Sequence, residues 1–292
     1  MASAAPPTVL YEPSSEGISL ITINRPKNRN AVNAATARLL AESFQKFDKD
    51  DTQKVCVFTG ARGEAFCAGY DLHEVAASSS SSPTTNIGPD ASSRVKPVTT
   101  TNPSDPLADV LGPMGPSRML TSKPVIAAIS GHAVAGGLEL SLLADMRVCD
   151  TTAVLGVFCR RFGVPLIDGG TVRLPKIVGL GRALDMILTG RPVDAKEALS
   201  MGLVNRVVEK GKAVGEATAL ARSLLAFPQE CMNLDRRSAY HSTFEAASLK
   251  DALKYEHEKG IEVVGKESVQ GATNFHKGKG RGGSFNLVKG KL

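Results

Sequence analysis

Short apolar runs alternate with segments of helical periodicity along the first two thirds of the chain. The most apolar run, Val125 to Ile129, follows a proline and is too short for an independent helix. Its β-branched residues favour a strand buried on both faces. Similar runs predict strands at 18–23, 55–58 and 146–149, and the pattern at 201–208 returns to that of a strand.

The segments between these strands and the last third of the chain have helical spacing. Apolar residues recur at intervals that predict helices at 33–47, 174–178, 182–188, 195–200 and 217–225, and a charged amphipathic run over 244–258. The repeated strand–helix units predict an α/β core over residues 1–208. The helical pattern of 215–264 predicts a helical C-terminal region over 209–292.

Composition changes sharply at residues 76–116. This segment holds five consecutive serines, Ser78 to Ser82, with many Pro and Thr residues and almost no apolar periodicity. Such a segment cannot form a core of its own. We expect a mobile low-complexity insertion that flanks the functional site, because it leaves directly after Asp71 and Leu72 and returns just before the strand at 125–129.

The stretch from Lys123 to Asp145 combines the most apolar strand with candidate chemistry. Gly136 and Gly137 follow the strand, and an apolar helical pattern then surrounds one isolated acid, Glu139. The first N–H groups of a helix have no internal acceptor, so a glycine pair there lets a polarised oxygen approach the bare backbone. Two interpretations stay open: an oxyanion hole beside a base, or a tight packing turn with a solvated glutamate.

A second glycine-rich loop follows the strand at 55–58. Residues 65–72 (AFCAGYDL) again expose backbone N–H groups just after a strand. Two such loops in one chain could converge on one oxygen, whereas the alternative is that both are ordinary turns between a strand and a helix.

Composition narrows the class of protein. The 292-residue chain has 42% hydrophobic and 22% charged residues, which is typical of a globular protein. None of its apolar runs approaches the length of about 18 residues that a transmembrane helix needs, so we expect no transmembrane segment. Its five cysteines are odd in number and form no CxxC pair, which suits a reducing compartment and offers no zinc site. Residues 1–7 show neither a signal peptide nor a clear mitochondrial presequence, so we expect a cytoplasmic or peroxisomal protein. The final Gly290-Lys291-Leu292 resembles a degenerate peroxisomal signal.

The net charge of +6 is concentrated near the end of the chain. Residues 276–292 carry Lys and Arg residues without an acid, a pattern that can meet the phosphates of nucleic acid or of a cofactor, or remain a solvated terminus. No GxSxG, GxxxxGKS/T or HExxH motif is present. The GxG at 179–181 lacks the preceding strand and the following acid of a dinucleotide site.

Four motifs, in order along the chain, carry a resemblance to a known family. They are NRPKNRNAV (24–32), AFCAGYDL (65–72), KPVIAAISGHAVAGGLEL (123–140) and LTGRPVDAKEALSMGLVNRVV (188–208). The sequence resembles the enoyl-CoA hydratase/isomerase, or crotonase, superfamily over residues 18–208, with a looser helical match beyond. The resemblance implies an α/β spiral of repeated ββα units with a C-terminal helical trimerisation region. It also implies a homotrimer or hexamer, and a coenzyme A thioester as substrate without a permanently bound cofactor or metal.

The resemblance further implies roles for individual residues. The oxyanion hole falls on the backbone N–H groups of Tyr70 and Gly136, and the first catalytic glutamate falls on Glu139. Two fixed N–H dipoles can stabilise a thioester enolate by several kcal/mol in a dry site. The positions that line the coenzyme A are Lys27, Asn28, Arg29, Ala68, Leu72 and His73.

The second glutamate of the family's hydratases falls on Cys159, which is the main departure from the family pattern. A thiol with a reference pKa of about 8.5 is mostly neutral at pH 7, so it could donate a proton but cannot orient a water molecule as a carboxylate does. The alternative is a buried apolar cysteine. Asp168 lies near the place where some isomerases and hydrolases of the superfamily carry an acid, although the register is off by one. It either touches the acyl group or caps the following turn.

These observations predict an acyl-CoA-processing enzyme of the hydratase/isomerase type, a lyase or isomerase with a single glutamate as acid/base. Two alternatives remain: a catalytically reduced acyl-CoA-binding protein, argued from Cys159, and an RNA-binding member, argued from the basic tail. We expect neither nucleic acid nor a membrane as a partner. Hydration, isomerisation and cleavage all stay open at this point.

Overall fold

The computed structural model of the chain describes residues 6–72 and 111–278, and its main sheet has six strands. In spatial order they are β1 (Val9–Pro13), β2 (Ile18–Ile23), β3 (Val55–Gly60), β5 (Val125–Ile129), β7 (Met146–Asp150) and β10 (Arg206–Val208). β1 pairs antiparallel with β2, and all other neighbours are parallel. The predicted strands at 18–23 and 125–129 are confirmed with their bounds, and β10 is shorter than the predicted 201–208.

The central strand β5 is buried on both faces, as its composition predicts. Val125, Ala127 and Ile129 belong to the larger hydrophobic cluster of the core, and Ile126 and Ala128 belong to a second cluster on the opposite face. All five residues have no exposed surface. Each buried Val or Ile contributes roughly 1.5–3 kcal/mol relative to exposure, so this strand fixes the middle of the sheet.

A second sheet of four short strands follows the first along the chain. Its order is β4 (Ala65–Cys67), β6 (His132–Val134), β8 (Val154–Gly156) and β9 (Val193–Asp194). β3, β5 and β7 of the main sheet are each followed by one of its strands, which gives the expected repeat of two strands and a helix. The sequence analysis predicted no element at residues 132–134, where the structure has β6. A three-residue strand is too short to show the period of two on which such a prediction depends.

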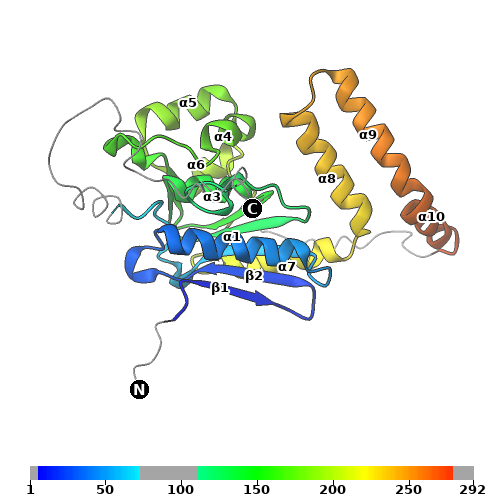
Figure 1. Cartoon of the computed structure of the whole chain (residues 1–292), viewed down its shortest axis with the longest axis horizontal. Coiled ribbons are helices and arrows are strands. Elements are labelled where there is room, and N and C mark those ends of the chain that lie inside the picture. Colours follow the sequence, from blue (N-terminus) through cyan, green and yellow to red (C-terminus); the bar gives the residue numbers. More distant parts are fainter. Residues whose placement is uncertain (1–5, 73–110, 279–292) are drawn as a thin grey trace, which may run out of the picture.

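Helices cover both faces of the main sheet. On one face α7 (Ala213–Leu225) packs its Ala217 and Ala221 against the second hydrophobic cluster. On the other face lies α1 (Ala34–Lys49), with the second sheet and α3 (Gly136–Leu143) above it (Figure 1). Further helices of this side are α4 (Gly170–Val178), α5 (Leu180–Thr189) and α6 (Ala195–Ser200), and short 3₁₀ turns lie at η1 (Pro26–Asn28), η2 (Ala61–Gly63), η4 (Pro116–Arg118) and η5 (Phe158–Phe162).

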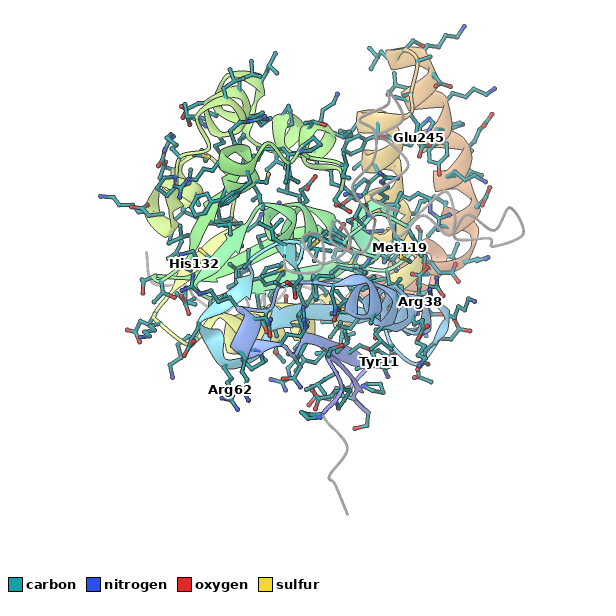
Figure 2. All side chains as sticks on the ribbon, turned by 60° about the vertical axis from the view of Figure 1, so that its left-hand side comes forward. Tyr11, Arg38, Arg62, Met119, His132 and Glu245 are labelled. Carbon is teal, nitrogen blue, oxygen red and sulfur yellow. The ribbon has the colours of Figure 1, made fainter. Side chains whose placement is uncertain are left out.

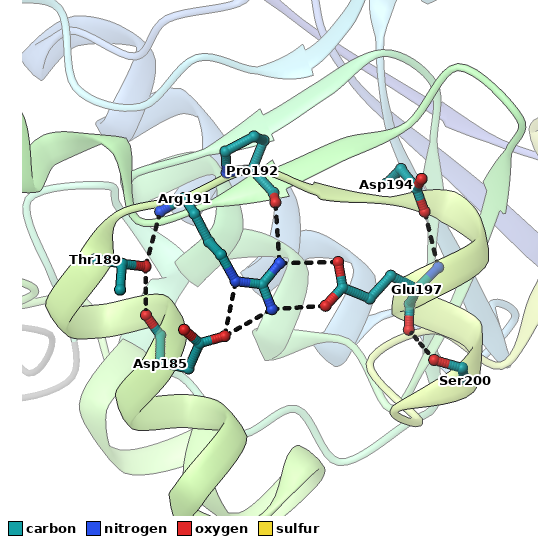
Figure 3. Close-up of polar contacts among 7 residues, drawn as sticks. All are labelled: Asp185, Thr189, Arg191, Pro192, Asp194, Glu197 and Ser200. Carbon is teal, nitrogen blue, oxygen red and sulfur yellow. Dashed lines mark hydrogen bonds and ion pairs between the residues drawn. The ribbon is translucent and has the colours of Figure 1, made fainter.

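An arginine joins α5 to α6 outside the core. The Arg191 guanidinium donates to the Asp185 carboxylate of α5 (2.7 Å) and forms two bonds to the Glu197 carboxylate of α6 (2.8 and 2.6 Å) (Figure 3). The three side chains are more than one third exposed, so the network orients the two helices rather than stabilising the fold by a large free energy.

The C-terminal helices form an arm that projects from the core (Figure 1). The arm consists of α8 (Gln229–Phe244), α9 (Leu249–Val263), the π-helical turn η6 (Val264–Ser268) and α10 (Val269–His276). Glu245, just past the end of α8, and Arg62 lie at opposite ends of the molecule (Figure 2).

The single helical run predicted over 244–258 is wrong, because the chain turns back between α8 and α9. The Ser248 hydroxyl accepts the N–H of Asp251, and the Asp251 carboxylate accepts the N–H of Ala247. These reciprocal bonds stop one helix and start the next.

One carboxylate attaches the arm to the core. Asp145 Oδ1 accepts from Arg236 Nε (2.7 Å) and from the Tyr240 hydroxyl (2.9 Å), both on α8. Its other oxygen accepts the N–H of Val125 at the start of β5 (2.7 Å). Arg236 and Asp145 are both largely buried, and the guanidinium also donates to the Thr121 carbonyl (2.7 Å).

The last residues of the predicted low-complexity insertion, 111–116, are packed and not mobile as expected. Residues 76–110 and the basic tail beyond 278 lie outside the described residues, and the division at residue 208 stays a prediction. Residues 111–116, however, belong to the packed structure: Leu111 is 5% exposed and Met114 is fully buried. Over the described ranges, no helix has the length and apolar character of a bilayer span.

The exposed apolar residues of the arm generate the first prediction. Leu249, Leu253 and Ile261 are 76%, 53% and 57% exposed on α9, and a stripe of this kind is a candidate subunit interface. We expect light scattering at micromolar concentration to give three or six times the 30.7 kDa mass of the chain. Leu253→Asp should lower this mass, because it places a charge in the buried contact. The exposed neighbour Lys250→Asp serves as control, and a monomeric wild type would contradict the expectation.

Candidate active site

A cavity of about 440 Å³ opens between α3, the segment 113–114 and η5. Its polar lining includes Tyr70, Glu139, Cys159 and Asp168, all of which the sequence analysis named. Its apolar lining includes Met114, Phe158, Phe162, Val164 and Ile167, none of which it named. The candidate catalytic residues therefore lie in one place, although they come from segments about 100 residues apart.

The two glycine-rich loops meet at this cavity. A Cβ atom added to Gly69 would lie 3.1 Å from the backbone nitrogen of Gly136, and Tyr70 and Gly136 both line the cavity. Gly136 is the first residue of α3, so its N–H has no acceptor within the helix. This arrangement has the convergence that the sequence analysis expected, while the oxyanion role of the two N–H groups stays a prediction.

The glycine pair at the start of α3 also serves close packing. A Cβ atom on Gly137 would lie 2.0 Å from the Cys67 carbonyl oxygen of β4, and one on Gly136 would lie 2.7 Å from the Met114 sulfur. The residue before them, Ala135, has a φ of 52° and a ψ of −127°, a conformation that L-residues rarely adopt. Strain of this kind persists only where the surrounding structure enforces it, and it clusters at functional sites.

Glu139 is a buried acid, so the alternative of a solvated glutamate was wrong. The residue is 3% exposed, and its Oε1 accepts the backbone N–H groups of Asp168 (2.9 Å) and Gly170 (2.8 Å). Burial, followed by the nearby negative charge of Asp168, raises the pKa of Glu139 to about 7. The two N–H donors and the Arg173 charge oppose this rise, but loss of hydration dominates.

Asp168 is equally buried, but its carboxylate faces away from the helix that follows it. Oδ1 accepts the N–H of Met114 (3.0 Å) and the hydroxyl of Ser117. The N-cap of α4 is Gly169, which has no side-chain hydrogen bond, so the expectation that Asp168 caps this turn was wrong. Burial raises the pKa of Asp168, and the two donors act against that rise.

Cys159 lies in η5 and faces the same cavity. It is 8% exposed, and burial together with the Glu139 charge raises the pKa of its thiol above the ordinary value. The side chain is therefore neutral over the physiological range. A neutral thiol is not a carboxylate base, so Glu139 and Asp168 are the carboxyl groups of this cavity in the described part of the chain.

Three of the predicted coenzyme A positions lie on the cavity wall or next to it. Ala68 and Leu72 line the cavity, and exposed Arg29 adjoins it, because its carbonyl accepts the N–H of Ala68 (3.1 Å). Lys27 and Asn28 are exposed in η1, immediately before Arg29. His73 falls outside the described residues.

Arg25 was missed in the sequence analysis, although it joins the segment at 24–32 to the glycine-rich loop at 65–72. Its guanidinium contacts the Asp71 carboxylate at 2.9 Å, and both side chains are largely buried. The sequence held no readable signal for this contact, because the ψ of 55° at Arg25 lies outside the extended range that a following proline favours.

A spiral of ββα units with a buried glutamate behind a glycine helix start defines an α/β enzyme of the crotonase class. The sequence profile of the enoyl-CoA hydratase/isomerase family matches residues 13–102 and 118–280, and the chain belongs to this family. It is therefore an acyl-CoA-processing enzyme of the lyase or isomerase type.

Individual relatives support the same assignment. A carnitinyl-CoA dehydratase of Salmonella arizonae is 36% identical over 205 residues, which cover 70% of each chain. An enoyl-CoA hydratase of Mycobacterium tuberculosis is 32% identical over 251 residues and 84% of each chain. Among solved structures, an enoyl-CoA hydratase from Mycobacterium tuberculosis superposes with a TM-score of 0.79 at 31% identity, covering 94% of this chain and 97% of that one.

The raised pKa of Glu139 predicts a pH-dependent cost in stability. Because the folded state holds this proton up to about pH 7 and the unfolded state only to 4.5, the free energy of unfolding should lose up to about 3 kcal/mol from this group as pH rises between those values. Glu139→Gln removes this titrating group and with it this loss of unfolding free energy. The variant should therefore gain stability relative to wild type from pH 5 to pH 7.5, measured by urea unfolding. Glu42→Gln, on the exposed side of α1, should show no such gain.

Proposed function

We propose that the protein moves a proton at the carbon next to a coenzyme A thioester, with Glu139 as the acid/base. The observation that carries this proposal is a carboxyl group with a pKa of about 7, 3% exposed, on the wall of an apolar cavity. A group with this pKa is present in both protonation states at neutral pH, so it can take a proton and return it. The bonds from Asp168 and Gly170 hold one of its oxygens in place.

The backbone N–H groups of Tyr70 and Gly136 are proposed to stabilise the enolate oxygen. Removing a proton beside the thioester moves negative charge onto the carbonyl oxygen, and fixed dipoles in a water-poor site lower the energy of that charge. The convergence of the Gly69 and Gly136 loops supports this role. The positive end of the α3 dipole adds to it.

Double-bond isomerisation is the reaction that these groups fit best. The Glu139 carboxylate would take a proton from C2 of a 3-enoyl thioester, the electron pair of that C–H bond would pass into a dienolate, and the Glu139 acid would return the proton to C4. The product is a 2-enoyl thioester, and no water is consumed. Hydration needs a second carboxylate to orient water, and the sequence resemblance assigns that position to Cys159, whose thiol is neutral.

The acyl group of the substrate is proposed to be apolar. Phe158, Phe162, Val164 and Ile167 form much of the wall beyond Glu139. Exposed Lys27 and Arg29 are proposed to meet the phosphates of the coenzyme, and the bond from Ala68 N–H to the Arg29 carbonyl supports this for Arg29. A panel of 2-enoyl, 3-enoyl, dienoyl and hydroxyacyl thioesters of graded chain length tests both the reaction and this preference. Tight binding of the panel without turnover would instead favour the acyl-CoA-binding alternative.

Glu139→Gln should abolish turnover and spare binding. The amide keeps the shape and one acceptor oxygen but cannot exchange a proton, so kcat should fall by about 10²- to 10⁴-fold while thioester affinity stays within a few-fold. Stopped-flow turnover and calorimetric Kd measure the two quantities, with Glu42→Gln as control. Turnover retained within tenfold would remove Glu139 from the mechanism.

Cys159 should behave as a spectator. Cys159→Ala should cost stability but leave kcat within about threefold, and Cys159→Glu should raise hydration of a short enoyl thioester, because it restores a carboxylate that positions water. Cys231→Ala, on α8 outside the cavity, is the matched control. A loss above about a hundredfold in kcat for Cys159→Ala, with the fold intact by circular dichroism, would make the thiol a proton donor.

A further inference from the structure

Asp168 makes contacts in two directions at once. Its backbone N–H donates to Glu139 Oε1 (2.9 Å), whereas its carboxylate accepts from Met114 N–H (3.0 Å) and from the Ser117 hydroxyl. The residue therefore connects the proposed acid/base with the segment that ends the low-complexity insertion.

Two arginines strengthen the same connection. Arg118 donates from Nε and Nη2 to the Ile167 carbonyl (3.1 and 2.8 Å), and Arg173 donates to the carbonyls of Ser117 and Met119. We call the joined residues 112–119 and 167–173 the clasp. Its bonds run from each segment to the other, so neither segment can shift without moving its partner.

The clasp is built closely around the Asp168 carboxylate. Gly112 and Gly115 exchange two backbone hydrogen bonds (3.0 and 2.8 Å), which fold the chain into a tight turn. A Cβ atom on Gly112 would lie 2.2 Å from Asp168 Oδ1. Only glycine leaves room for the carboxylate at this point, and the carboxylate in turn satisfies a buried N–H and a buried hydroxyl.

Met114 of the clasp lies against Gly136, the residue whose N–H is proposed to bind the enolate oxygen. Met114 is fully buried, and a Cβ atom added to Gly136 would lie only 2.7 Å from its sulfur. Gly136 supplies one of the N–H groups proposed for the enolate. Asp168 thus lies between the acid/base on one side and the wall of the enolate site on the other.

We propose that Asp168 is a positioning residue: its carboxylate holds Met114 against Gly136 while its backbone holds Glu139, and it exchanges no proton with the substrate. This inference rests on the proposed role of Glu139. Both donors to Asp168 Oδ1 are groups of the clasp, as a positioning role requires. Burial raises the pKa of this carboxyl group, and the same two donors oppose that rise.

The Asp168 charge provides a readout that a purely structural role would not move. Among the described residues, the charged and titratable groups around Glu139 are Asp168 and Arg173 from the segment after residue 167, Cys159 from η5, and Tyr70 in the lining of the same cavity. Asp168 raises the pKa of Glu139 and Arg173 lowers it. Removing the Asp168 charge should therefore make Glu139 a stronger acid.

Asp168→Asn tests this inference, because the amide oxygen can still accept from Met114 and Ser117 while the charge is lost. The titration midpoint of Glu139 is followed by carboxyl ¹³C NMR, with Glu139→Gln to identify the signal. We expect the midpoint to fall by about half a pH unit or more, and kcat on the best thioester of the panel to stay within about tenfold. Asp150→Asn, another buried aspartate with several donors, should leave the midpoint unchanged.

The outcomes separate this inference from the proposed function. A kcat loss above about a hundredfold in Asp168→Asn with an unmoved Glu139 midpoint would make Asp168 a proton carrier and overturn the inference. An unmoved midpoint with unchanged kcat would overturn it as well. If the wild type turns over no thioester but the midpoint falls, the proposed function fails and the positioning role stands. If Asp168→Asn does not fold, Asp168→Ser also removes the charge while keeping an acceptor oxygen, and the midpoint should fall in the same direction.

Discussion

The burial of the Glu139 carboxyl group is the constraint on which the site depends. A carboxylate loses hydration when it is buried, and two backbone N–H donors offset only part of that loss. To reach this position, α3 must start against β4, where Gly137 leaves no room for a side chain. The loop at 168–170 must also cross back over α3, and this crossing sets the place of α4. The buried strand β5 and its covering helix α7 supply the rigid base beneath these elements.

Local pattern predicted the elements that bury the most surface and missed those that bury little. Residues 18–23 and 125–129 are long enough to show their character, whereas the strands of the second sheet have two or three residues and no readable period. The glycine loops indicated exposed N–H groups, but only the family resemblance placed Glu139 and Tyr70 in one site. Met114 and Ser117 escaped notice because they end a segment whose serine and proline content favours disorder. Their contacts are long-range, and no spacing in the sequence encodes them.

The thiol at Cys159 changes the electrostatic balance of the cavity. A second glutamate there would add a third carboxyl group beside Glu139 and Asp168, and like charges in a low-dielectric site raise one another's pKa values. With a neutral thiol, the cavity holds two carboxyl groups in the described part of the chain, one of them fixed by the clasp. The neutral thiol at residue 159 therefore leaves Glu139 with one neighbouring carboxyl group, that of Asp168, where a glutamate at 159 would give it two.

The attachment of the arm at Asp145 has a consequence for how the sequence can diverge. One carboxylate serves both the first N–H of β5 and two side chains of α8, about 90 residues further along the chain. Substitution of Asp145 leaves the buried Arg236 guanidinium without its counterion. Substitution of Arg236 leaves the buried Asp145 carboxylate without its counterion. A substitution at either position alone should therefore be destabilising. Across relatives with the same attachment, residues 145 and 236 should covary, although one belongs to the core and the other to the arm.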